Sequence, residues 1–299
     1  MELWVPITIA AAFCQNLRSA LQKHLKGSLS TSGATFSRFC YAVPFAWVYL
    51  AAVAGVTGDA LPDAHATFLG FAVLGGVAQI AATALLVYLF SFRNFTVGTT
   101  YSKTETIQTA LFGALIIGDT ISAQTTAAIL ISLAGVFALS VARTELTARR
   151  LMTSWLDKPA LIGLASGACF GISAVSYRAA SLSLETGGFA TRAAFTLAVV
   201  LVFQTVAMAV YMRIREPGQI TRVARSWRVS LWVGVSGMAA SAGWFTAMTI
   251  ENAAHVRALG QIELVFTFIA SVAFFRERTN LPEMIGILLV VAGILVLLL

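Results

Sequence analysis

The sequence predicts an all-α polytopic membrane protein whose ten transmembrane helices form two inverted repeats of five helices each. Three observations support this fold class. The 299 residues are 58% hydrophobic and 11% charged, whereas soluble domains carry roughly 25% charge. Apolar stretches long enough to cross a bilayer recur along the whole chain. The second half of the sequence repeats the first half at a nearly constant spacing.

The apolar stretches account for nearly the whole chain, and each has the roughly 20 residues that about 30 Å of hydrocarbon requires. The first stretch lacks a basic flank and a clear small-residue cleavage site, so we expect a retained helix rather than a signal peptide. We expect helices near residues 3–22, 33–54, 68–92, 97–118, 124–142, 159–182, 189–212, 229–249, 256–275 and 281–299.

The internal repeat is clearest in GVAQIAATA (76–84) and GVSGMAASA (234–242), which share five identities in nine residues at a spacing of 158. The same spacing relates Glu105 to Glu263. It also relates Asn94 to Asn252, Asp119 to Glu277, and Ala134-Gly135-Val136 to Ala292-Gly293-Ile294.

The first two helices of each half match at a spacing of 154, which relates Gly33 to Gly187 and Arg38 to Arg192. We therefore expect a first five-helix repeat at residues 1–142, a cytoplasmic linker at 143–158 and a second repeat at 159–299. Because five is odd, the second repeat crosses the membrane in the opposite sense. Inverted repeats related by an axis in the membrane plane are typical of proteins that work by alternating access.

Lysine and arginine residues gather in the loops on one side of the predicted bundle, which indicates the cytoplasmic side. Both termini are then expected to be periplasmic. These short loops also account for the net charge of +7, so the charge does not indicate nucleic-acid binding. The basic residues are Lys23, Lys26, Arg93, Arg143, Arg149, Arg150, Lys158, Arg213, Arg215, Arg222, Arg225, Arg228, Arg276 and Arg278.

Glu105 and Glu263 each lie inside a long apolar run. A carboxylate in hydrocarbon is costly and usually functional. One interpretation is that the two glutamates couple transport to protons or hold a cationic group. The other is a polar clamp between helices, in which a neighbouring arginine or backbone group neutralises the carboxylate. The sequence leaves both open.

Further polar residues recur at helical spacing and predict a substrate cavity. The alternatives are that the serines allow close helix approach and that the tryptophan anchors at the membrane interface. Arg38 and Arg192 either gate this cavity, contact a substrate carboxylate, or extend towards the interface. The expected cavity residues are Gln15, Ser19, Gln79, Thr83, Tyr101, Ser173, Ser176, Tyr177, Trp244 and Gln261.

The sequence has no motif that predicts an enzyme, a cofactor or a metal site. It lacks a P-loop, an HExxH pair and a GxSxG elbow. Cys14, Cys40 and Cys169 have no metal-ligand spacing. The expected partners are a small-molecule substrate and the lipid bilayer, with no nucleic acid and no obligatory protein partner. A membrane-embedded enzyme is the alternative from a different class.

Gly118-Asp119-Thr120 through Leu133-Ala134-Gly135-Val136, and Arg276-Glu277-Arg278 through Val291-Ala292-Gly293-Ile294, resemble the last two helices of each repeat in the drug/metabolite transporter superfamily. The resemblance is to its ten-helix, two-repeat (EamA-type) members, and most closely to bacterial exporters of amino acids, including aromatic ones. It implies a cavity between the repeats, and export of amino acids or similar metabolites across the inner membrane.

Two other kinds of substrate stay open at this stage. A multidrug exporter would use the glutamates to bind organic cations. An exchanger of phosphorylated metabolites would use Lys103 or Arg257.

Overall fold

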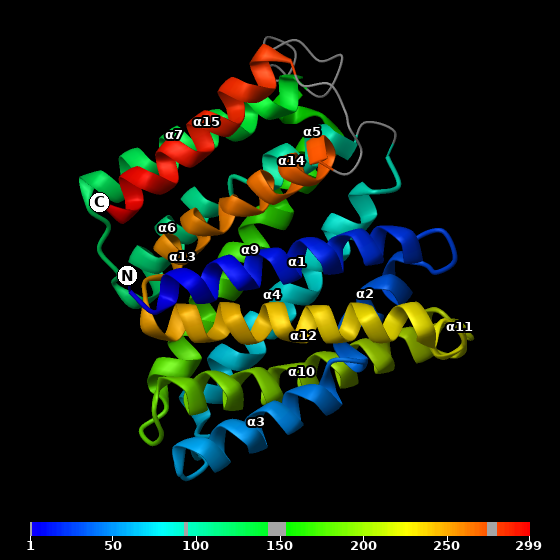
Figure 1. Cartoon of the computed structure of the whole chain (residues 1–299). Coiled ribbons are helices and arrows are strands. Elements are labelled where there is room, and N and C mark those ends of the chain that lie inside the picture. The colour runs from blue at the N-terminus through cyan, green and yellow to red at the C-terminus, as the bar shows by residue number, and fades with distance from the viewer. Residues whose placement is uncertain (1, 93–94, 143–153, 274–279) are drawn as a thin grey trace.

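A computed structural model describes residues 2–92, 95–142, 154–273 and 280–299, and in these ranges all regular secondary structure is helical (Figure 1). The all-α prediction is therefore confirmed. The helices are α1 (Trp4–Leu25), α2 (Thr31–Cys40), α3 (Val43–Thr57), α4 (Ala66–Leu89), α5 (Phe95–Ser102), α6 (Glu105–Ile117), α7 (Ala123–Ala142), α9 (Lys158–Ser183), α10 (Phe189–Arg215), α11 (Gln219–Arg225), α12 (Trp227–Ile250), α13 (Ala253–Leu259), α14 (Glu263–Ala273) and α15 (Leu281–Leu298), with 3-10 turns at Ser154–Leu156 and Gly260–Ile262.

Seven helical stretches in the described ranges are long and apolar enough to cross a membrane, which confirms a multi-pass protein. They are Thr31–Thr57, Ala66–Leu89, Ala123–Ala142, Lys158–Ser183, Phe189–Arg215, Trp227–Ile250 and Leu281–Leu298. The other three expected spans do not reach this combination of length and apolar composition, and each has a physical reason. Helix α1 carries polar residues including Arg18 and Lys23, and the spans expected at 97–118 and 256–275 are each interrupted. Ten crossings stay a prediction.

The two interruptions lie directly before the two glutamates. Helix α5 ends at Ser102 and α6 begins at Glu105, while α13 ends at Leu259 and a 3-10 turn leads to Glu263 at the start of α14. A carboxylate in the first turn of a helix is stabilised by the positive end of the helix dipole. Tyr101 and Glu105 are four residues apart, a spacing that would place them on one face of a continuous helix. Because the helix is broken here, they do not share such a face.

Helix boundaries repeat along the chain at a spacing of 158. Phe95 and Ala253, Glu105 and Glu263, and Ala123 and Leu281 are helix starts separated by this distance. The spacing of 154 expected for the first two helices holds only for the starts of α1 and α9, since α2 and α10 start at Thr31 and Phe189, again 158 apart. The helix boundaries therefore do not align Arg38 with Arg192.

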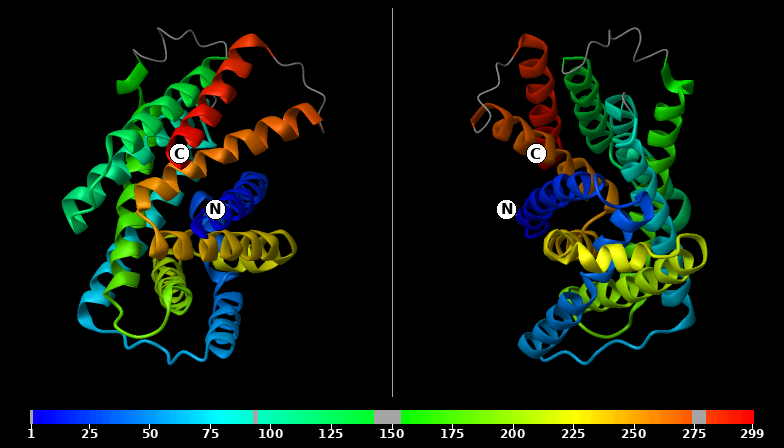
Figure 2. Two further views of the ribbon diagram at one scale, coloured as in Figure 1. Left: turned by 60° about the vertical axis from the view of Figure 1, so that its left-hand side comes forward. Right: turned by 90° about the vertical axis from the view of Figure 1, so that its right-hand side faces the viewer.

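The most extensive helix contacts join a helix of the first half to a helix of the second half. Helix α1 packs along α12, α9 packs along α4, and α7 packs along α15 (Figure 1); both views in Figure 2 show α1 beside α12. If α1 corresponds to α9 and α4 to α12, the first two pairs are the same contact with the halves exchanged. The third pair joins corresponding helices. A pseudo-two-fold axis would produce this pattern.

The loop after α3 is tied to the start of α10. The Asp59 carboxylate accepts hydrogen bonds from the Thr191 hydroxyl at 2.6 Å and from the Gly188 amide at 2.9 Å. The Thr191 hydroxyl and then the Gly188 amide hold the pKa of Asp59 below its ordinary value. This contact joins two connections that are distant in sequence at one end of the bundle.

Glycines set the close approach of α7 and α15. A Cβ atom added at Gly135 would lie 2.6 Å from the Gly286 carbonyl oxygen, and one at Gly293 would lie 2.7 Å from the Ala128 carbonyl oxygen. Both contacts are with backbone atoms that cannot rotate away. The Ala-Gly-hydrophobic motif therefore has a packing role in each half.

We expect Gly135→Ala and Gly293→Ala each to lower the free energy of unfolding by roughly 1–3 kcal/mol, because overpacking forces α7 and α15 apart. Thermal unfolding in detergent micelles measures the effect. Gly55→Ala is the matched control, since a Cβ atom there meets nothing within 4 Å. Equal melting temperatures for all three variants would contradict a close packing role.

Candidate functional site

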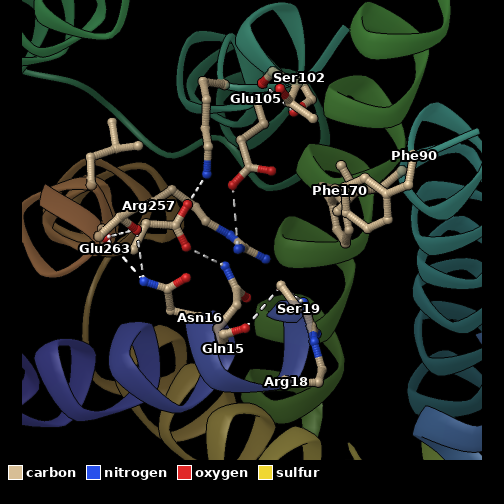
Figure 3. Close-up of a pocket in the computed structure, with 15 residues that line it drawn as sticks. Gln15, Asn16, Arg18, Ser19, Phe90, Ser102, Glu105, Phe170, Arg257 and Glu263 are labelled. Carbon is tan, nitrogen blue, oxygen red and sulfur yellow. Dashed lines mark hydrogen bonds and ion pairs between the residues drawn. The ribbon is translucent and has the colours of Figure 1, made fainter. Parts of the chain in front are cut away.

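A polar cavity of about 160 Å³ lies where α1, α4, α5, α6, α9, α13 and α14 meet. This is smaller than the roughly 300–1,000 Å³ of a typical ligand pocket. Figure 3 shows Gln15 and Asn16 directed towards Glu263, with Arg257 between Gln15 and Glu105. The lining residues are Gln15, Asn16, Arg18, Ser19, Leu86, Phe90, Thr99, Ser102, Lys103, Glu105, Phe170, Arg257, Glu263, Leu264 and Thr267.

Glu263 is held by groups from both halves of the chain. Its carboxylate forms an ion pair with Lys103 and accepts a hydrogen bond from Gln15 Nε2 at 3.0 Å. The Asn16 amide donates to the Glu263 carbonyl oxygen at 3.3 Å and to the Thr267 hydroxyl at 2.8 Å. The first turn of α14 is therefore fixed to α1 and to the α5–α6 break.

Glu105 of the first half is paired with a cation of the second half, just as Glu263 of the second half is paired with Lys103 of the first. Arg257 Nη1 lies 3.4 Å from Glu105 Oε1, and the Arg257 guanidinium lies 4.8 Å from the centre of the Trp244 ring. Trp244 Nε1 donates to Gln15 Oε1 at 3.0 Å. Each glutamate is therefore paired with a cation from the opposite half, as in the polar-clamp interpretation.

A second cavity adjoins the first and shares Gln15, Phe170 and Arg257 with it. Its free volume is small, about 10 Å³. Aromatic rings form much of its wall, and Tyr177 stacks on Phe245 with ring centres 4.3 Å apart. The other lining residues are Arg38, Gln79, Ser241, Trp244 and Met248.

Polar residues of the second cavity bind one another. The Tyr177 hydroxyl donates to Gln79 Oε1 at 3.1 Å, and Gln204 Nε2 donates to the same oxygen at 2.9 Å. Arg38 Nη1 donates to the Thr83 hydroxyl at 2.7 Å. These bonds join four helices, α2, α4, α9 and α10, around the cavity.

Most of the expected site residues come together here. Gln15, Ser19, Gln79, Tyr177, Trp244, Glu105, Glu263 and Arg38 line the two cavities, and Thr83 binds Arg38.

The other expected site residues lie elsewhere. Tyr101 packs edge-on against Phe137, with ring centres 5.8 Å apart. Gln261 donates to the Thr106 hydroxyl at 3.0 Å, and Ser173 and Ser176 are fully buried in α9. Arg192 donates to the Leu184 carbonyl oxygen at 3.5 Å and lines neither cavity. This agrees with the helix boundaries, which do not align Arg192 with Arg38.

The sequence predicts no site role for Arg18 or Gln204, and it indicates Lys103 only for the alternative of phosphorylated substrates. Arg18 lies in the polar stripe of the first helix, and its side chain is 2% exposed. Lys103 precedes Glu105 by two residues, and this second charge in an apolar run is a signal for a helix break. Gln204 has no charged neighbour in sequence and gives no comparable signal.

At the other end of α9, Arg178 joins three segments. Its Nη1 donates to the carbonyl oxygens of Met248 at 2.7 Å and Glu251 at 2.6 Å, and its Nε lies 3.4 Å from the Asp119 carboxylate. Beside it, the Glu251 carboxylate contacts His255 Nδ1 at 2.9 Å, and this hydrogen bond holds the pKa of Glu251 below its ordinary value. This end of the bundle is cross-linked by polar contacts.

Several expected residues lie outside the described ranges. They are Arg93, Asn94, Arg143, Arg149, Arg150, Arg276, Glu277 and Arg278, together with most of the expected linker at 143–158. Within the described ranges, no three His, Cys, Asp or Glu side chains gather in a way that could hold a metal ion.

Known proteins resemble this chain in sequence and in fold. Residues 157–299 match the EamA-like transporter family, which is a family of transporters and not of enzymes. A segment of 86 residues, 28% of this chain, is 33% identical to a Sinorhizobium sp protein described as "Uncharacterized transporter in cobO 3'region". That match covers 57% of the relative. A solved structure described as "Crystal structure of protein" has a TM-score of 0.70 at 17% identity, over 99% of this chain and 95% of that chain, and this likeness concerns the fold alone.

The Lys103–Glu263 ion pair can be tested by a double-mutant cycle. We expect Lys103→Met or Glu263→Gln alone to lower the free energy of unfolding by roughly 3–5 kcal/mol, because each leaves a largely buried charge without its partner. Replacing both should cost clearly less than the two single changes added together. Thermal unfolding of the four proteins in one detergent gives the coupling. Additive effects would show that the pair contributes nothing to stability.

Proposed function

We propose that this chain is a secondary transporter with ten membrane spans in two inverted repeats, which exports amino acids or similar small metabolites across the bacterial inner membrane by alternating access. The observation that carries the proposal is the buried, charged cavity between the two halves of an all-helical membrane protein. The match of residues 157–299 to the EamA-like transporter family supports it. The repeat extends this similarity to the first half.

The repeats in this proposal are residues 1–142 and 159–299, joined by a cytoplasmic linker at 143–158. The exchanged packing of α1 on α12 and α9 on α4 supports two corresponding halves. The basic loops lie on the cytoplasmic side and the termini on the periplasmic side. Rocking of one half against the other would then present the same cavity to each side in turn.

Access to the cavity follows from the positions of its residues along the helices. Leu86 and Phe90 lie at the end of α4, and Ser102 and Lys103 lie at the break that follows α5. These segments adjoin the basic loops. The Arg178 contacts with Met248, Glu251 and Asp119 lie towards the opposite end. We therefore assign the structure to a state open towards the basic loops, with Arg178 closing the other side.

Energy coupling is assigned to the two glutamates. Protonation of Glu105 would release Arg257, and protonation of Glu263 would release Lys103, because each carboxylate pairs with that cation. Both pairs bridge the halves, so a proton would weaken a contact that holds the present arrangement. This gives the glutamates a role in the cycle that is compatible with their role as a clamp.

Proteoliposomes loaded in turn with radiolabelled amino acids, organic cations and sugar phosphates test the proposal. We expect counterflow of at least one amino acid or related metabolite, with a rate that depends on pH. Glu105→Gln and Glu263→Gln should each reduce the pH dependence, because a glutamine cannot exchange a proton. Counterflow that is independent of pH and has the same rate in both variants would overturn the assignment of proton coupling to Glu105 and Glu263.

The direction of opening is tested by single cysteines in a variant whose three native cysteines are replaced. Ser102→Cys should react with a membrane-impermeant thiol reagent only from the side that also labels Arg225→Cys, because Ser102 lines the cavity near the basic loops. Adding Arg178→Ala should make Ser102→Cys reactive from the opposite side as well, which Gln124→Cys marks. Labelling of Ser102→Cys only from the Gln124 side would reverse the assignment.

A further inference from the structure

The two adjoining cavities carry more positive than negative charge. Their lining includes the four basic residues Arg18, Arg38, Lys103 and Arg257, but only two acidic residues, Glu105 and Glu263. Lys103 pairs with Glu263, and Arg257 pairs with Glu105. Both carboxylates are therefore already engaged by cations.

Arg18 and Arg38 carry the remaining positive charge. Their side chains are 2% and 4% exposed, and neither forms an ion pair with a carboxylate in the described part of the chain. Their guanidinium groups donate hydrogen bonds to hydroxyls, Arg18 to Ser19 at 3.3 Å and Arg38 to Thr83 at 2.7 Å. Arg18 Nε is buried and, among the described atoms, has no hydrogen-bond partner.

The two arginines meet at Gly237 of α12. A Cβ atom added there would lie 3.4 Å from Arg18 Cδ and 3.4 Å from Arg38 Cγ, so both side chains pass the same glycine. The positive charges of Arg18 and Arg257 both repel that of Arg38, while the carboxylate of Glu105 attracts Arg18. Two neighbouring guanidinium groups buried in an apolar bundle are costly unless an anion joins them.

The corresponding position in the first half is chemically different. A spacing of 158 relates Gly237 to Gln79, whose side chain binds the neutral partners Tyr177 and Gln204. A side chain as large as glutamine at position 237 would occupy the space that Arg18 and Arg38 use. The two halves therefore differ in the groups that they place at this position.

We infer that the substrate carries a net negative charge and binds with its carboxylate or phosphate group between Arg18 and Arg38. This inference rests on the proposed transport function and adds the substrate class. The anionic group would replace the hydration of both arginines with charge-assisted hydrogen bonds. The aromatic side chains of Phe170, Tyr177, Trp244 and Phe245 line the adjoining wall and favour an apolar or aromatic body there. The free volume at this wall is only about 10 Å³, so these side chains must move apart to admit it.

The same arrangement disfavours an organic cation as substrate. A cation would need Glu105 or Glu263, and each must first leave Arg257 or Lys103. It would also add to an existing excess of positive charge. The multidrug-exporter alternative is therefore less compatible with this cavity than an exporter of organic anions.

A series of probes that share one aromatic body and differ in charge tests the inference. The probes are 3-phenylpropionate, phenyl phosphate, phenylalanine and phenethylammonium. We expect at least one of the two anions to raise the melting temperature of the purified protein and to compete in counterflow, and phenethylammonium to do neither. Vesicles of phosphatidylcholine carry no net headgroup charge, and a parallel set with the anionic phosphatidylglycerol tests a lipid as the source of the anion.

Arg18→Gln and Arg38→Gln should each weaken anion binding roughly 30-fold or more, because truncating one partner of a buried charge pair has at least this effect. Arg18→Lys and Arg38→Lys keep the charge and should retain part of the binding. Arg213→Gln, on the exposed end of α10, removes the same charge outside the cavity and should leave binding unchanged. Monodisperse elution in detergent confirms that each variant is folded.

Four results would overturn the inference. They are a preference for phenethylammonium, anion binding that survives both glutamine variants, stabilisation only by phosphatidylglycerol, and no anion binding by the folded protein. A folded protein that binds the anions through Arg18 and Arg38 but moves no solute in any vesicle would instead contradict the transport function. The two failures are therefore distinguishable.

Discussion

The crossed pairing of buried charges is the constraint on which the rest of the structure depends. A carboxylate inside an apolar bundle needs a partner, and here Glu105 pairs with Arg257 while Glu263 pairs with Lys103. Each pair joins the two halves of the chain. This requires the first turns of α6 and α14 to face the same central space, which is why both expected spans are interrupted directly before a glutamate.

The positions of the helices could be predicted from the sequence, but the interruptions could not. Apolar runs must be at least as long as the membrane is thick, so their limits lie within a few residues of the helix ends, as at Ala123–Ala142 and Leu281–Leu298. An interruption leaves the run equally apolar. Only the single charge of Lys103 marks the first break, and the 3-10 turn at Gly260–Ile262 carries no charge, so hydropathy reveals neither.

Which polar residues share the cavity could be predicted only within single helices. Helical spacing placed Gln15 and Ser19 together correctly, since they lie one turn apart on α1. The expectation that Tyr101 lines the cavity depends on a continuous helix over residues 97–118, and the break after Ser102 removes that condition. The meeting of Arg18 and Arg38 depends on Gly237 of a third helix, and no pattern within one helix contains that contact.

The chemistry of the cavity repeats less than its backbone does. At a spacing of 158 the two glutamates correspond, but their partners do not, since Lys103 corresponds to Gln261 and Arg257 to Thr99. Arg38 likewise corresponds to the neutral Thr196. Alternating access needs two similar backbones around one cavity, whereas a single substrate needs one asymmetric set of side chains. Divergence of the cations around repeated carboxylates satisfies both requirements. It leaves Arg18 of α1 and Arg38 of α2 without a carboxylate partner in the described part of the chain. In the proposed binding mode the first half therefore contributes the binding groups, and the second half contributes Gly237, beside which both side chains pass.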